Sequence, residues 1–249
     1  MFDLTGTVAL VTGAGQGVGA GICDVLARQG AAIAVNDLHG ERAQQTVEAI
    51  ARDGGRAVAA PFDVTDRGAV ATAVADVEAA LGPVDILINN AGIPETMAAV
   101  KFLDTDPGAW DPYIDVNLYG VLNCSKAVVD GMCDRGWGRV ITISSGAGVV
   151  GLNIGVSLYA AGKGGAIAFM RHLAMETARK GVTANSLALG LMHKERADRT
   201  VTGAMEKQIP VGRLGTGLDI GYLCAYVASR EASWMTGQTI NINGGSVTS

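Results

Sequence analysis

Short apolar runs alternate with longer stretches of helical period along the whole chain. The runs are rich in Val, Ile and Ala, which is typical of strands buried on both faces. They occupy Val8–Thr12, Ala32–Asn36, Arg56–Ala60, Ile86–Asn89, Arg139–Ser144, Thr183–Ala188 and Thr239–Asn243. Helical periodicity covers Val18–Gln29, Glu41–Arg52, Asp66–Leu81, Tyr113–Arg135, Ser157–Lys180 and Leu218–Ala228. This alternation predicts right-handed crossovers, and therefore an α/β, Rossmann-type doubly wound parallel sheet of about seven strands with helices on both faces.

No repeat, low-complexity tract or linker-like stretch interrupts this pattern. We therefore expect residues 1–249 to form a single domain. The segment from about 191 to 211 is long, charged and poor in sheet signals. Long loops in compact domains are often lids, so we expect a substrate lid at about 191–211.

Composition and charge exclude several classes of protein. Apolar residues make up 49% and charged residues 17%, unlike a disordered chain. The net charge of −5 provides no basic field for nucleic acid. The four cysteines form no C-x-x-C pair and no zinc spacing, so we expect reduced thiols and no metal. Without a signal segment or an uninterrupted apolar span, the sequence predicts a cytoplasmic protein with no membrane partner.

A glycine-rich turn follows the first expected strand directly. Residues 12–19 read Thr-Gly-Ala-Gly-Gln-Gly-Val-Gly and lead into a helical pattern. A helix N-terminus at such a turn forms an anion site, because free backbone N–H groups and the positive end of the helix dipole face the same point. This predicts a pyrophosphate contact, although the same run also suits a simple tight turn. The contact residues expected here are Gly13, Gln16, Gly17, Val18 and Gly19.

Asp37 follows the second expected strand, where a dinucleotide fold places its ribose-binding acid. A carboxylate at this position accepts hydrogen bonds from both adenosine ribose hydroxyls and repels a 2′-phosphate. The neighbours Gln16 and Leu38 supply no positive charge. We therefore expect NAD (NADH) as the cofactor and NADP as the less favoured one. The alternative interpretation makes Asp37 the N-cap of the next helix.

Tyr159 and Lys163 stand four residues apart at the start of a long helical stretch. This spacing puts the phenol and the ammonium on one helical face, where the ammonium is expected to lower the pKa of the phenol. A tyrosine ordinarily titrates at about pH 10, so a neighbouring cation makes it a usable acid–base group. By itself such a pair more often marks a solvated helix face.

Taken together, these motifs resemble those of the short-chain dehydrogenase/reductase family along nearly the whole chain. The glycine turn matches the family's TGxxxGxG, and Tyr159 with Lys163 completes its catalytic set. The other matching segments are Asp63-Val64 (the adenine-ring contact), Asn89-Asn90-Ala91-Gly92 (the strand-stabilising NNAG), Asn117 in Val-Asn-x-x-Gly, Ser145 (the catalytic serine) and Thr236 to Gly245 (the last strand).

The resemblance implies hydride transfer between a substrate carbon and a nicotinamide ring. Tyr159 is then expected to exchange a proton with the substrate oxygen, while Lys163 lowers its pKa and holds the nicotinamide ribose. Ser145 is expected to hydrogen-bond the substrate oxygen. Asn117 is expected to open its helix locally and anchor a water that leads protons away from Lys163. Further cofactor contacts are expected at Asp63, Val64, Asn90, Ala91, Gly92 and Gly190.

Simpler interpretations remain open, and three features depart from the family pattern. Ser145 also suits a loop-capping hydroxyl, and Asn117 an ordinary mid-helix residue. The distance from Ser145 to Tyr159 is one residue longer than in many relatives, which leaves Ser144 as a lesser candidate. Where the family has Pro-Gly and a threonine near the nicotinamide amide, this chain has Leu189-Gly190 and Lys194.

Three glycines in the long helix weaken it by about 1 kcal/mol each relative to alanine. They are Gly162, Gly164 and Gly165. We expect close packing of this helix on a neighbouring subunit to compensate, within a homo-oligomer (a tetramer or dimer).

Apolar residues dominate the expected substrate pocket, which favours a hydrophobic ketone or secondary alcohol. Substrate contacts are expected at Ser145, Leu152, Tyr159 and Met192. The basic lid residues suit either an acidic substrate or a solvated lid face; they are His193, Lys194, Arg196 and Arg199.

The leading hypothesis is an NAD-dependent oxidoreductase of apolar secondary alcohols and ketones. The enzymatic alternative is a 3-oxoacyl-thioester reductase, acting on acyl-carrier-protein or CoA thioesters with NADPH. A non-catalytic dinucleotide-binding sensor is the alternative from another class.

Overall fold

The computed structural model describes residues 1–93, 97–193 and 199–248, with the backbone alone for 199–202. All seven expected strands form, with ends within about two residues of the predicted ones. They are β1 (Val8–Val11), β2 (Ala32–Val35), β3 (Ala57–Ala59), β4 (Ile86–Asn89), β5 (Gly138–Ser145), β6 (Val182–Leu189) and β7 (Thr239–Ile242). They form one parallel sheet in the order β3-β2-β1-β4-β5-β6-β7, which confirms the predicted fold class.

The direction of winding changes at β1. Val11 pairs with Val35 of β2 on one side and with Ile88 of β4 on the other. In open parallel sheets, the crevice for a ligand lies at this switch point, outside the carboxyl ends of the strands. The glycine turn follows β1 directly and therefore lies at the crevice.

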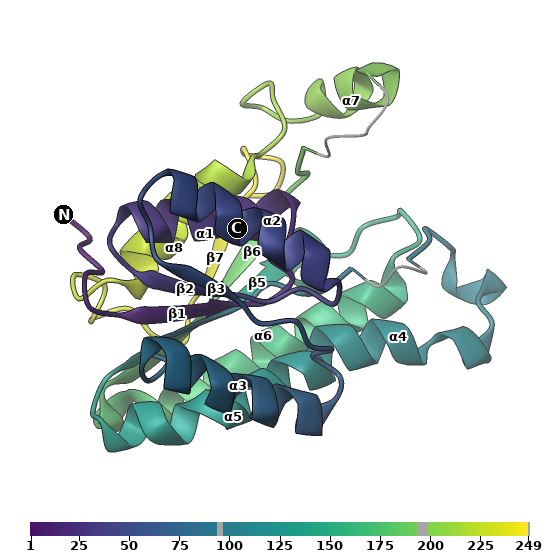
Figure 1. Ribbon diagram of the computed structural model, residues 1–249. Helices are drawn as coiled ribbons and strands as arrows, with labels where there is room; N and C mark the ends of the chain where they lie inside the picture. Colours follow the sequence, from purple (N-terminus) through teal and green to yellow (C-terminus); the bar gives the residue numbers. More distant parts are fainter. Residues whose placement is uncertain (94–96, 194–198, 249) are drawn as a thin grey trace.

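Helices cover both faces of the sheet (Figure 1). One face carries α1 (Gly17–Arg28), α2 (Gly40–Arg52) and α8 (Gly217–Ala228); the other carries α3 (Arg67–Leu81), α5 (Gly120–Asp134) and α6 (Ser157–Thr177). Each set buries its apolar side chains in a separate core. Ile22 and Ile220 lie in the first core, and Val128 and Met170 lie in the second.

The expected helix from Tyr113 to Arg135 consists of three pieces. A short α4 (Asp111–Ile114) leads into a π-helical turn, η3 (Asp115–Tyr119), and then into α5. Single π-helical turns inside helices are frequent at functional sites. The short 3-10 turns are η1 (Phe102–Asp104), η2 (Pro107–Ala109), η4 (Gly146–Gly148) and η5 (Ala178–Lys180).

The predicted lid segment lies partly outside the described residues, which exclude Lys194 and Arg196. Its described part contains α7 (Arg199–Glu206), which stands apart from the sheet and its covering helices in Figure 1. The start of the segment is joined to the chain just beyond its end by backbone hydrogen bonds, because Gly215 N donates to Leu191 O (3.0 Å) and His193 N donates to Gly215 O (2.8 Å). The base of the segment is therefore held closed.

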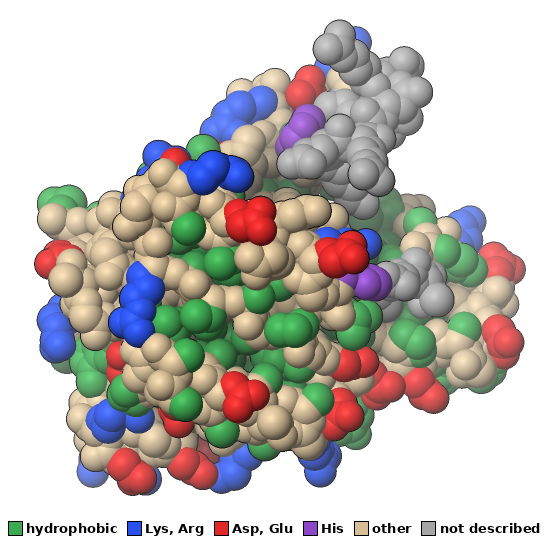
Figure 2. Space-filling view, viewed as in Figure 1, with side chains coloured by type: hydrophobic (Ala, Val, Ile, Leu, Met, Phe, Trp, Pro, Cys, Tyr) green, Lys and Arg blue, Asp and Glu red, His purple; other side chains and the backbone are tan. Residues whose placement is uncertain are grey.

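Acidic and basic side chains are interspersed over the face shown in Figure 2, with no continuous patch of either sign. Within the described residues, no helix is both long and apolar enough to cross a bilayer. The described His, Cys, Asp and Glu side chains form no group suited to a metal ion. All four cysteines are free.

Candidate active site

The glycine turn after β1 has a backbone that only glycine accommodates at two positions. Gly13 has φ +58° and Gly17 has φ +56°, in the left-handed region. A Cβ on Gly13 would lie 2.9 Å from Ala91 Cα, and one on Gly19 would lie 2.5 Å from Gly13 O. Around Gly17, by contrast, a Cβ would meet nothing within 4 Å. The turn is therefore closely packed on β4 and open where it begins α1.

The N-terminus of α1 offers unsatisfied backbone donors at this open side. Gln16 occupies the N-cap position, and its side chain makes no capping hydrogen bond. The first-turn N–H groups, including those of Gly17, Val18 and Gly19, thus lack a capping side chain and suit an external anion. The residues present fit the pyrophosphate of a dinucleotide.

Three side chains that hold the turn in place form a hydrogen-bonded frame. Thr12 Oγ1 accepts from Asn90 N (3.0 Å) and Ala91 N (3.1 Å). Asn90 Nδ2 donates to Thr12 O (2.9 Å) and Gly13 O (2.8 Å), and Asn36 Oδ1 accepts from Gly13 N (3.2 Å). The side-chain amide of Asn90 thus orients the glycine turn, and its expected contact with the cofactor stays a prediction. Asn36 was not predicted; a buried asparagine at a strand end was the available signal.

Asp37 lies beside the turn and is only 6% exposed. Its Oδ2 accepts from Gly15 N (3.1 Å), and its Oδ1 accepts from His39 N (3.0 Å). The N-cap of α2 is His39, so the alternative interpretation of Asp37 as that cap is wrong. Arg42 packs against the same turn, because a Cβ on Gly15 would lie 2.5 Å from Arg42 Cβ.

The residues expected at the adenine ring follow β3. Asp63 is exposed, and its Oδ1 accepts from Thr65 N (2.9 Å) and Thr65 Oγ1 (2.8 Å). Val64 is buried, and a Cβ on Gly120 would lie 2.7 Å from Val64 Cγ2. A glycine at the start of α5 thus lets Val64 pack at the side of the crevice.

The two candidate serines at the end of β5 have different surroundings. Ser144 is buried, and its Oγ donates to Lys163 O (3.3 Å), which ties β5 to α6. Ser145 is half-buried; its Oγ accepts from Ala147 N (3.2 Å), and its hydroxyl lies close enough to the Tyr159 phenol to act on the pKa of that phenol. Ser145 is therefore the serine beside the tyrosine, despite the longer spacing.

Tyr159 and Lys163 lie together on α6. Lys163 Nζ is 5.8 Å from the centroid of the Tyr159 ring, as their spacing predicted. Lys163 is 3% exposed, and its Nζ donates to Ile143 O (2.7 Å). Burial lowers the pKa of Lys163 to about 8. Most Lys163 side chains carry a proton at neutral pH.

The pKa of Tyr159 moves in the opposite direction from the one expected. Burial raises it above the ordinary value, and the hydrogen bond from Ser145 opposes this only in part. The prediction that Lys163 lowers it is wrong for this structure, because desolvation of the phenolate is the larger effect. Tyr159 is therefore a neutral phenol at neutral pH.

Asn117 lies in the π-helical turn beside these residues. Its Nδ2 donates to Tyr113 O (2.9 Å), while its buried Oδ1 has no hydrogen-bond partner. A Cβ on Gly92 would collide with both Lys163 Nζ and Asn117 Oδ1, so position 92 requires a glycine. The geometry leaves an acceptor oriented toward the lysine.

The glycine in the middle of the site allows two helices of the same chain to approach closely. A Cβ on Gly162 would lie 2.7 Å from Asn117 Cβ and 2.7 Å from Tyr113 O. We expected a neighbouring subunit to compensate for Gly162. For Gly162 the close packing is made within the chain, and the packing of α6 on a neighbouring subunit stays a prediction.

The expected substrate contacts lie beyond the carboxyl ends of β5 and β6. Leu152 is 43% exposed, and Met192 is half-buried beside Gly215, with which it forms a bridge. Gly190 N donates to Ile242 O (3.1 Å), and a Cβ on Gly190 would lie 2.8 Å from Asn243 Cα. Gly190 thus lets β6 and β7 end side by side.

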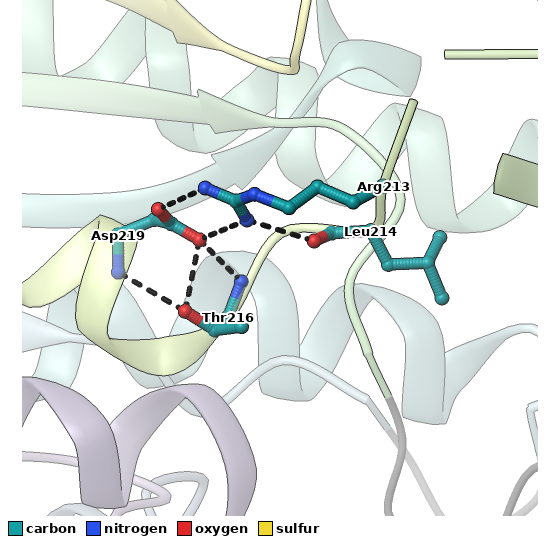
Figure 3. Close-up of polar contacts among 4 residues, drawn as sticks. All are labelled: Arg213, Leu214, Thr216 and Asp219. Carbon is teal, nitrogen blue, oxygen red and sulfur yellow. Dashed lines mark hydrogen bonds and ion pairs between the residues drawn. The ribbon is translucent and has the colours of Figure 1, made fainter. Parts of the chain in front are cut away.

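A polar network holds the far end of the lid segment onto α8 (Figure 3). Arg213 binds Asp219 through two hydrogen bonds, Nη1 to Oδ2 (2.8 Å) and Nη2 to Oδ1 (2.7 Å). Asp219 also forms a capping box with Thr216, and these partners lower its pKa well below its ordinary range. Sequence reasoning missed this anchor, although Thr-x-x-Asp before an apolar run was its signal.

Comparisons with known proteins agree with this geometry. The sequence profile of the short chain dehydrogenase family matches residues 7–203. Nodulation protein G of Rhizobium sp. (strain N33) is 39% identical over 98% of this chain and 98% of its own. The 3-oxoacyl-(acyl-carrier-protein) reductase of Escherichia coli (strain K12) is 36% identical, with the same coverage of both chains.

The fold also matches a solved dehydrogenase. A gluconate 5-dehydrogenase from Burkholderia cenocepacia J2315, crystallised with NADP and tartrate, superposes with a TM-score of 0.90. It is 34% identical and aligns over 98% of this chain and 96% of its own. With the family profile and full-length relatives in agreement, this chain belongs to the short chain dehydrogenase family and is an oxidoreductase of CH–OH or keto groups that uses a nicotinamide dinucleotide.

Proposed function

We propose that this enzyme transfers hydride between NAD(H) and an apolar secondary alcohol or ketone. The observation that carries the proposal is the meeting of Ser145, Tyr159 and Lys163 at the carboxyl edge of the sheet, next to the glycine turn. When bound, the dinucleotide supplies hydride chemistry at its nicotinamide. The side chains of this protein supply the proton transfer and select the substrate.

The proton donor for ketone reduction is the Tyr159 phenol. Because burial raises its pKa, the phenol keeps its proton at neutral pH and donates it to the substrate oxygen. Ser145, which lies beside that phenol, is placed to donate to the same oxygen and stabilise the charge that develops on it. For alcohol oxidation the phenol must first lose its proton, so that direction needs higher pH.

Lys163 and Asn117 supply the proton path behind the phenol. Lys163 is protonated up to a pH of about 8, and it is placed to bind the nicotinamide ribose. The buried Asn117 Oδ1 without a partner is a satisfactory acceptor for a water next to Lys163 Nζ. Such a water connects the lysine to solvent.

The substrate class is proposed from the apolar side chains at the carboxyl edge. Large hydrophobic side chains that follow β4, β5 and β6 remain exposed there, and a binding site lined in this way favours an apolar substrate. They are Ile93, Val149, Leu152, Ile154 and Leu191.

A panel of substrates tests this proposal directly. With NADH, we expect apolar cyclic and long-chain ketones to be reduced with a kcat/KM at least about 10 times that of 5-ketogluconate, because desolvating hydroxyl groups against apolar walls costs about 1–3 kcal/mol each. Initial rates of NADH oxidation measure this. Faster reduction of acetoacetyl thioesters with NADPH would establish the thioester alternative, which the Escherichia coli relative favours.

The preference for NAD is proposed from Asp37. We expect NADH to exceed NADPH in kcat/KM by about 30-fold or more, because like charges a few ångströms apart repel by about 2–4 kcal/mol near a protein surface. Asp37→Ala should reduce this ratio to a few-fold. Glu41→Ala, which removes an exposed carboxylate from the first turn of α2, four residues after Asp37, is the matched control and should retain it. A wild-type enzyme that prefers NADPH, with Arg42 as the nearby cation, would overturn the assignment.

We also propose that the chain forms a homo-oligomer and that it is cytoplasmic. Large hydrophobic side chains that are strongly exposed on this chain support a homo-oligomer; they are Met175, Tyr222 and Trp234. Four free cysteines support a reducing, cytoplasmic environment.

A further inference from the structure

A second cavity lies at the amino edge of the sheet, opposite the active site. Its volume is about 240 Å³. Its walls come from the segments that precede β1, β4 and β5 and from the end of α8. The lining residues are Asp3, Leu4, Thr5, Gly6, Thr7, Asp85, Arg135, Trp137 and Arg230. None of them belongs to the proposed catalytic or dinucleotide site.

Two guanidinium groups flank one wall of this cavity. The Cζ atom of Arg139 lies 4.7 Å from the centroid of the Trp137 ring, and that of Arg230 lies 5.4 Å from it. Burial and the nearby Arg230 charge lower the pKa of Arg139 to about 10. Two like charges thus meet at one indole in a protein whose net charge is −5.

Arg139 is buried without a carboxylate. It is 2% exposed, and its Nε and Nη1 donate only to the backbone carbonyls of Ser229 (3.2 Å), Gly138 (2.9 Å) and Gly181 (3.4 Å). Within the described part of the chain it makes no ion pair, and neither does Arg230. Buried charges in proteins are normally paired, so Arg139 lacks its counter-charge, and Arg230 beside it is exposed.

The acidic groups of the cavity are already engaged. Asp85 Oδ2 accepts from Val8 N (3.2 Å), and its Oδ1 pairs with Arg135 Nη2 (3.4 Å). Asp3 Oδ1 accepts from both the N–H and the hydroxyl of Thr5. Trp137 Nε1, by contrast, is buried with no acceptor among the described residues. The unsatisfied groups here are donors and cations.

We propose that this cavity binds a small oxyanion, a phosphate or carboxylate group, held by Arg230 in front of Trp137. The anion supplies the negative charge that Arg139 and Arg230 lack. The site is independent of the dinucleotide and the substrate, since it lies at the other edge of the sheet. Binding there stabilises the folded chain by mass action.

Thermal unfolding in inorganic phosphate tests the proposal, with sodium chloride of equal ionic strength as the reference and with saturating NADH to occupy the glycine turn. We expect phosphate to raise the Tm of the wild type saturably by about 2–5 °C. Malonate in place of phosphate distinguishes a carboxylate ligand from a phosphate ligand. The absence of an anion-specific increase with both probes would overturn the proposal.

Arg230→Asp makes the test specific, because it places a carboxylate beside Arg139. We expect this variant to have a higher Tm in chloride and to lose the response to phosphate. Arg230→Gln should lose the rise of Tm in phosphate without having a higher Tm in chloride. This variant keeps the test valid if the aspartate variant does not fold. Arg52→Asp changes the charge equally at the exposed end of α2 and should retain the response. A response that persists in Arg230→Gln would place the anion elsewhere and overturn the site.

Discussion

Replacing Tyr159 with Phe is expected to lower kcat for ketone reduction by about 10³-fold, within the range of general acid–base catalysis. The variant loses the hydroxyl that donates the proton and the partner of Ser145, but it keeps the ring that packs near Lys163. The dissociation constant for NADH should stay within about twofold, measured by quenching of tryptophan fluorescence. Turnover should be measured at saturating NADH.

Tyr222→Phe provides the matched control, since Tyr222 is 62% exposed on α8 and should tolerate loss of its hydroxyl with unchanged kcat.

The pH profile separates a chemical role for Tyr159 from a structural one. Because the pKa of Tyr159 is raised, the rate of ketone reduction should be constant through neutral pH. The rate of alcohol oxidation should increase toward alkaline pH. Retention of wild-type turnover in Tyr159→Phe would assign the proton donor to another group.

Replacing Lys163 with Met is expected to abolish turnover and to stabilise the fold. The ammonium is buried and bound to a single described acceptor, Ile143 O, so the folded state bears the cost of its desolvation. Methionine fills a similar volume without charge. We expect the free energy of unfolding at pH 7 to rise by about 1–2 kcal/mol, as in other sites where function costs stability.

The pH dependence of this gain has a definite sign. The pKa of Lys163 is about 8 in the folded chain and about 10.4 in an unfolded one. Between these values the unfolded chain holds a proton that the folded chain has released, so the stability of the wild type rises with pH. Below pH 8 the folded chain carries the full desolvation cost of the charged Lys163 ammonium, so the advantage of Lys163→Met is largest there.

Urea denaturation measures both effects. The advantage of Lys163→Met should shrink from pH 7 to pH 10, while Lys180→Met, at an exposed position, should show neither the gain nor its pH dependence. A variant that is less stable than the wild type at pH 7 would show that the hydrogen bond to Ile143 O outweighs the desolvation of the ammonium.

The architecture was predictable because it repeats a simple pattern. Strands buried on both faces need continuous apolar runs, and crossover helices need one apolar stripe. Both patterns can be read from residues close together in sequence, so each strand and most helices were placed within a few residues. The glycine turn was predictable for the same reason, since positive φ at Gly13 and Gly17 is a local requirement.

In the candidate site, the sequence predicted only those neighbours that follow from the spacing of residues along one helix. Four residues along a helix bring Tyr159 and Lys163 to one face, whatever surrounds them. Spacing did not choose between Ser144 and Ser145, because that choice depends on which hydroxyl lies beside the Tyr159 phenol in the folded chain. It also gave no indication of the Arg139 and Arg230 pair, whose members are distant in sequence.

The sequence by itself thus determined the order of strands and helices, the phosphate turn and the family of the enzyme. The tertiary structure alone decided the strand order of the sheet, the contact of Gly92 with Lys163 and Asn117, and the raised pKa of Tyr159. Burial and charge at a point are sums over neighbours from many segments, and no local pattern in the chain contains that sum.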